Sequence, residues 1–186
     1  MTLESLRFQV GAGDGLVARF GGRALVVPRW SPDQTRVLDE LVGVVEAEEA
    51  AEPLSSRRLA RRVAGILTRE EPEQVPGFAA LFSTEDDGLA LIIHGDVEAT
   101  VTTRGGTETL SGRQVATWVD HIVREPVDSL HVQAADAGAP APPARFDLRG
   151  GVVPAGALLL TRVSPPAGER VAAPAAEPTP VPQPAP

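Results

Sequence analysis

Residues 77–112 consist of short apolar or alternating runs separated by glycine turns, "GFAALFSTEDDGLALIIHGDVEATVTTRGGTETLSG". Continuous apolar runs and alternation with a period of two are typical of strands. Asp87-Gly88 and Gly105-Gly106 favour tight hairpin turns, because such residues adopt a positive φ at low steric cost. The stretch therefore predicts successive antiparallel strands and places a sheet at the centre of the fold.

The segment before these strands predicts more extended chain, followed by two helices. Runs in residues 5–27 are interrupted by Gly13-Asp14-Gly15, interpreted as a hairpin loop, and by Gly21-Gly22. A helix then begins near Pro32, which suits a first turn, and Ser31 or Asp33 can act as its cap. Its apolar stripe has helical spacing and consists of Val37, Leu38, Leu41, Val44 and Val45. Pro53 marks the break before a second helix over residues 54–69.

A third helix is predicted over residues 112–125, with Ser111 as its cap and Pro126 after its end. Its apolar stripe comprises Val115, Trp118, Val119 and Ile122. Residues 129–133 and 144–163 supply the last strands. Because the strands are clustered in sequence and the helices are grouped apart from them, we expect an α+β fold: a layered antiparallel β-sandwich flanked by helices.

Two stretches of the chain are rich in proline and alanine, one inside the folded unit and one after it. Residues 134–144 read as a long loop, and residues 164–186 contain few large apolar side chains, so that they favour an extended, solvated chain. We therefore expect one α+β domain over residues 1–163 and a disordered tail or linker over 164–186.

The composition weighs against several functional classes. The chain has no Cys, which excludes disulfides, thiolate nucleophiles and cysteine-ligated zinc. A net charge of −8 argues against nucleic-acid binding. No basic segment precedes an apolar one at the start, and no apolar run is long enough to insert into a membrane. A cytoplasmic protein is the expectation.

The one concentration of positive charge is "SSRRLARR", within the second predicted helix. Helical spacing places Arg57, Arg58, Arg61 and Arg62 on one face, opposite an apolar face. This arginine face is interpreted as the solvent-exposed side of an amphipathic helix. The alternative is a patch that binds an anion or an acidic protein partner.

His94-Gly95-Asp96 and the acidic residues are the other candidates for chemistry. The histidines show no metal-ligand spacing, and a glycine before an aspartate suits a tight turn, so the turn is the favoured interpretation. Two-metal phosphatase chemistry needs clustered carboxylates. Asp14, Asp87 and Asp96 are the candidates for a manganese or magnesium site, although the densest acidic stretch, residues 83–88, also suits a solvated hairpin tip.

From residue 77 to 112 the chain resembles the central strands of the metal-dependent protein phosphatase (PPM) family. The resemblance rests on the order of apolar strand, turn, apolar strand and Gly95-Asp96, followed by a third strand with a glycine turn. With the upstream strands and helix pair, it covers about residues 5–125. It implies a sandwich fold and, in an active member, two bound metal ions.

The departures from that family concern its metal ligands. Where the family carries Asp-Gly-x-Gly-Gly-His, this chain has "VVPRWSPDQ", and Asp14 is a weak substitute for an early acidic ligand. The absence of that motif implies a pseudophosphatase or binding scaffold without a cofactor. The composition, rich in Ala, Gly, Pro and Arg, is that of a high-GC actinobacterial genome. The acidic domain with its proline-rich linker is similar to the front end of actinobacterial proteins with a forkhead-associated (FHA) domain.

We therefore expect a non-catalytic protein-interaction or regulatory domain in bacterial signalling, with a protein partner such as FHA-containing machinery. The candidate contact residues are Trp30 and the arginine face, because exposed tryptophans anchor interfaces. Trp118 is interpreted as a core residue. The alternatives are a divergent metal-dependent Ser/Thr phosphatase and a small-ligand sensor.

Overall fold

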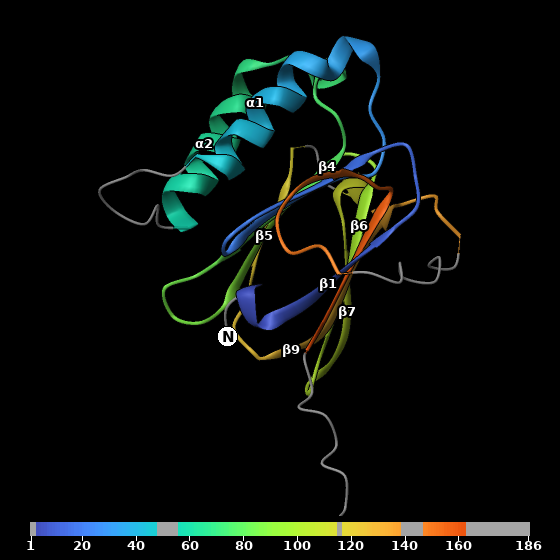
Figure 1. The fold of residues 1–186 in the computed structure, drawn as a ribbon. Coiled ribbons are helices and arrows are strands. Elements are labelled where there is room, and N and C mark those ends of the chain that lie inside the picture. Colours follow the sequence, from blue (N-terminus) through green and yellow to red (C-terminus); the bar gives the residue numbers. More distant parts are fainter. Residues whose placement is uncertain (1–2, 48–55, 115–116, 139–146, 163–186) are drawn as a thin grey trace, which may run out of the picture.

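The computed structural model describes residues 3–47, 56–114, 117–138 and 147–162, which form two antiparallel sheets and two α-helices (Figure 1). The expected α+β class is confirmed at this level. The predicted tail, most of the long loop over 134–144 and the break at Pro53 lie outside these residues. No helix in the described ranges is long and apolar enough to span a lipid bilayer.

Five strands form the first sheet, named the open sheet because no described helix lies over its outer face. In spatial order they are β1 (Leu6–Gly11), β11 (Ala157–Arg162), β9 (Val127–Ala134), β6 (Val97–Thr103) and β7 (Gly106–Ser111). Burial alternates along β6 and β9, with apolar residues directed inward and threonine, serine, histidine and glutamine outward. Such alternation is what a sheet with one buried face requires.

Six strands form the second sheet, named the covered sheet. In spatial order they are β10 (Gly151–Pro154), β2 (Leu16–Phe20), β3 (Arg23–Val27), β4 (Phe78–Ser83), β5 (Leu89–His94) and β8 (Val119–Val123). In β4 and β5 the first five residues are all buried. These runs are continuous and apolar because one face packs on the open sheet and the other on helices.

Helices α1 (Thr35–Glu46) and α2 (Ser56–Arg69) pack side by side on the covered sheet (Figure 1). A short 3-10 turn over Pro32–Gln34 leads into α1, and its Gln34 side chain accepts a hydrogen bond from the Ser31 N–H at 3.0 Å. The buried residues of α1 are Val37, Leu38, Leu41, Val44 and Val45, as its spacing predicts. From α2, Leu59, Val63 and Ile66 enter the same core.

Charged groups tie the ends of the two helices together. Arg36 of α1 pairs with Glu70, just after α2, and Arg69 of α2 donates to Glu40 of α1 at 2.7 Å. The hydrogen bond from Arg36, assisted by one from Arg69, lowers the pKa of Glu70 below its ordinary value. The network fixes the helix pair as one cover over the sheet.

Two turns carry the chain from one sheet to the other. Residues 12–15 join β1 of the open sheet to β2 of the covered sheet, so the hairpin interpretation of Gly13-Asp14-Gly15 is wrong. His94-Gly95-Asp96 is a turn, as predicted, but it joins β5 to β6 across the sandwich. Gly95 has a φ of +67°, which favours glycine. A Cβ there would lie 3.1 Å from the Cα of Gly77.

The helix predicted over residues 112–125 is wrong. Gly112–Gln114 form a 3-10 turn, and β8 follows as an edge strand paired to β5. The edge position leaves Ile122 49% exposed, whereas Trp118 is partly buried against the helix-side core, in agreement with its interpretation as a core residue. Short apolar runs fit both periodicities, and the β-branched Val119, Ile122 and Val123 suit the strand.

Candidate functional site

The first candidate site lies where β3 ends and β6 begins. Pro28, Arg29 and Trp30 follow β3 of the covered sheet, and Asp96 precedes β6 of the open sheet. Together with neighbouring residues they line a cavity of about 300 Å³. Trp30 is 40% exposed, as expected for a contact residue. The structure therefore brings two sequence-predicted residues, Trp30 and Asp96, to one pocket.

Asp96, which lines this pocket, has an arginine partner, and the lining residue Arg29 has a carboxylate partner. Arg113 donates from Nε to Oδ1 of Asp96 at 2.7 Å, and this hydrogen bond lowers the pKa of Asp96 below its ordinary value. Arg29 pairs with Asp136, which follows β9. Local sequence patterns do not predict the roles of Arg29 and Arg113, because their partners are distant in sequence. The pairs favour ionised carboxylates engaged by protein cations.

The three aspartates of the metal hypothesis do not gather. Asp14 is exposed in the turn before β2, and Asp87, with a φ of +58°, lies in the β4–β5 hairpin. Strand β5 separates Asp87 from Asp96, and a strand of that length spans about 20 Å. Two bridged metal ions sit about 4 Å apart, so Asp87 and Asp96 are too distant to share such a centre. Among the described residues, no three His, Asp or Glu are grouped to hold a metal.

His94 has a structural role in the described contacts. Its Nδ1–H donates to the Thr117 carbonyl at 2.7 Å, and its ring lies 5.9 Å from the ring of Phe78. The hydrogen bond holds the segment before β8 against the end of β5. These contacts fit the interpretation of His94-Gly95-Asp96 as a turn and require no catalytic role for His94.

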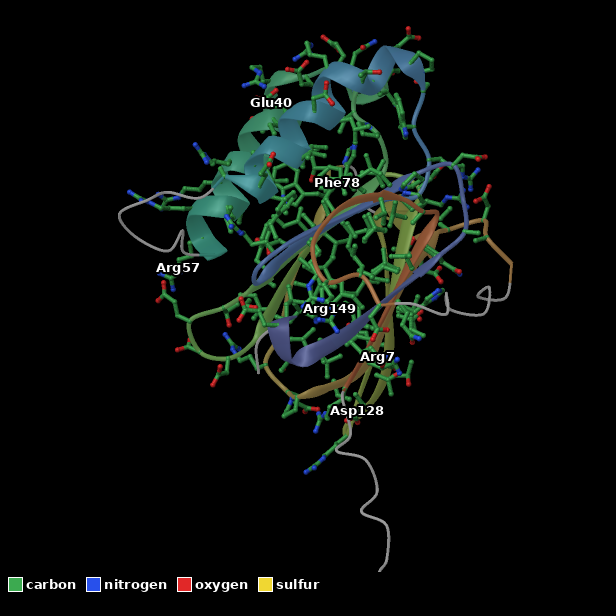
Figure 2. All side chains as sticks on the ribbon, viewed as in Figure 1. Arg7, Glu40, Arg57, Phe78, Asp128 and Arg149 are labelled. Carbon is green, nitrogen blue, oxygen red and sulfur yellow. The ribbon has the colours of Figure 1, made fainter. Side chains whose placement is uncertain are left out.

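The arginine face of α2 forms the second candidate site. Arg57, Arg58, Arg61 and Arg62 are all exposed, and Figure 2 shows Arg57 directed away from the sandwich. Within the part of the chain that the structure describes, no ion pair involves Arg57, Arg61 or Arg62. The amphipathic pattern is confirmed, and it leaves a cationic surface on an acidic protein.

The α2 dipole does not account for that cationic surface. Arg57 and Arg58 occupy the first turn, which holds no acidic residue. Positive charge at a helix N-terminus is unfavourable, by a few tenths of a kcal/mol or more when exposed. Arg57 and Arg58 therefore gain no stabilisation from the helix dipole.

Known proteins supply no further assignment. Comparison of the chain with protein-family models, with curated proteins and with solved structures finds no match.

Proposed function

We propose that the domain is a non-catalytic protein-interaction or regulatory module in bacterial signalling, of the pseudophosphatase type, with a PPM-like sandwich. The observation that carries the proposal is the arginine face: closely spaced exposed cations, in a chain of net charge −8. The pair of helices packed on an antiparallel sandwich supports the likeness to the PPM family over the first half of the chain. The described residues place no second helix layer on the open sheet.

The chemistry of the arginine face selects an acidic protein segment as partner. Guanidinium groups bind carboxylates and phosphates in a bidentate geometry, and exposed arginines accelerate association with an oppositely charged partner. Arg57 and Arg61 are one helical turn apart, so a single extended or helical acidic segment can contact both. Machinery that contains an FHA domain is the partner class that the sequence resemblance proposes.

A direct test uses a fluorescently labelled Glu-rich peptide as probe and anisotropy as readout. The double substitution Arg57→Glu and Arg61→Glu is expected to weaken binding by about tenfold or more, because two charge-assisted contacts become repulsive. The matched control carries Arg104→Glu and Arg124→Glu, which change two other exposed arginines by the same charge. Equal weakening in both variants would contradict the proposal, because binding would then follow net charge alone.

An aryl-phosphate assay with manganese tests the enzymatic alternative. The proposal expects no turnover above a buffer control. Sustained turnover that Asp14→Ala or Asp96→Ala abolishes would replace the interaction module with a divergent metal-dependent phosphatase.

A further inference from the structure

A cleft of about 570 Å³ lies beside the C-terminal end of β2. The pocket that contains Trp30 lies at the opposite end of this strand. Four arginines and two carboxylates line it, with apolar residues between them. The charged lining residues are Arg7, Arg19, Arg149, Arg162, Glu4 and Asp147. In Figure 2, Arg7 and Arg149 appear beside β1, away from the two helices.

Arg19 is directed into the layer between the two sheets. Along β2, Ala18 and Phe20 pack toward the helices, while Val17 belongs to the inter-sheet core, so alternation turns Arg19 toward that core. Its guanidinium carbon lies 3.8 Å from the ring centroid of the buried Phe8, and Nη1 donates to the Leu148 carbonyl at 2.7 Å. Burial lowers the pKa of Arg19 below its ordinary value, which reflects partial loss of water around the cation.

Arg162, at the end of β11, also carries an unfilled hydrogen-bonding capacity. Its Nη2 lies 3.0 Å from Asp128 and donates to the Val127 carbonyl at 3.3 Å. Its Nε is buried and has no hydrogen-bond partner among the described residues. Buried N–H groups are nearly always paired, so this donor is an unusual feature of the cleft wall.

The other two arginines of the cleft, Arg7 and Arg149, differ in their hydrogen bonds and ion pairs. Arg7 donates from Nε to both carboxylate oxygens of Asp147 at 2.8 Å, so each neutralises the other. Arg149 is exposed, and no hydrogen bond or ion pair within the described ranges involves its side chain. Arg149 thus carries positive charge that no described ion pair engages, whereas the charge of Arg19 is partly offset by Glu4 and Asp147.

We propose that this cleft binds a small molecule through an oxyanion, a phosphate or a carboxylate group, with Arg19 and Arg149 as donors and Arg162 in the cleft wall. The cleft volume falls within the range of small-ligand sites, and guanidinium groups match the geometry of both anions. Partial desolvation strengthens each contact relative to the same contact in water. The inference does not depend on the proposed function.

The test measures backbone amide shifts of the full chain by NMR. Inorganic phosphate and malonate are titrated separately, against sodium chloride at equal ionic strength. We expect saturable shifts at Arg7, Leu148 and Arg162 with one of the two anions, with half-saturation near about a millimolar for so small a probe. The anion that saturates identifies the ligand class.

Variants separate this site from general charge attraction. Arg149→Ala removes an exposed side chain and is expected to weaken binding about tenfold, while Arg149→Lys retains part of the affinity. Arg104→Ala, an equal charge change in the β6–β7 hairpin, is expected to leave it unchanged. Linear, non-saturating shifts with both anions, or equal weakening by Arg104→Ala, would overturn the inference.

Discussion

The two sheets of the sandwich share one core but differ in their outer faces. The covered sheet is buried on both sides, and β4 and β5 are accordingly continuous apolar runs. The outer face of the open sheet carries threonines whose hydroxyl groups form cross-strand hydrogen bonds. The Oγ1 atoms of Thr100 and Thr109 are 3.3 Å apart, and those of Thr102 and Thr107 are 3.1 Å apart. The hydrophobic pattern of a strand therefore depends on how many faces of its sheet are covered, and not only on the strand conformation.

The largest effect is expected from Phe82→Ala in β4. Phe82 is fully buried between the covered sheet and the helices, so its loss is expected to lower the free energy of unfolding by about 3–5 kcal/mol. Thr100→Ala on the open sheet removes one cross-strand hydroxyl contact and is expected to cost less than about 1 kcal/mol. Chemical denaturation measures both values. Similar losses would show that the outer face of the open sheet is also covered.

The connection between the sheets gives an intermediate effect. Gly95→Ala places a Cβ at a φ of +67° and is expected to destabilise the domain by about 1–2 kcal/mol. Gly65→Ala is the matched control, because this exposed helical glycine has nothing within 4 Å of the added Cβ. Its replacement is expected to stabilise α2 by about 0.5–1 kcal/mol. If Gly95→Ala leaves the thermal unfolding temperature unchanged, the backbone of the β5–β6 connection must adjust to the added Cβ.

The smallest effect concerns His131 on the outer face of the open sheet. Burial, only partly offset by Glu98, lowers the pKa of His131 below 6.5. The folded state then binds a proton less readily than the unfolded state, so this residue's contribution to stability is present above about pH 6.5 and declines as the pH falls through the folded pKa. His131→Gln is expected to flatten that decline between about pH 8 and about pH 5. An unchanged pH dependence would show that the His131 ring is as accessible to water in the folded state as in the unfolded state.

The sequence predicted the parts of the fold that depend on local patterns. The five buried residues of α1 and the strands within residues 77–112 follow from periodicity, because neighbours within an element set that signal. The sheet crossings did not follow, since the same glycine turn serves a hairpin or a passage between sheets. The helix expected over 112–125 was wrong because β8 owes its conformation to pairing with β5, a partner that its own residues do not encode.

The sites were predictable to a smaller extent. Trp30 was found because tryptophan is rare in this chain, and the arginine face because four arginines recur at helical spacing. Arg19 was missed, although alternation along β2 places it on the same face as Val17. Its partners in the cleft, Arg149 and Arg162, come from the other end of the chain. Only the assembled sandwich brings these residues together.

The pairing of β1 with β11 has a consequence for how the chain reaches its native state. Leu6 pairs with Arg162, and β11 lies between β1 and β9, so the first strand has no place in the sheet until almost all of the domain has been synthesised. Closing so long a stretch of chain is slow compared with forming the β4–β5 hairpin. On the ribosome, strands β2 to β5 of the covered sheet and the two helices can therefore pack first, whereas β1 can pair only after β11 has been made.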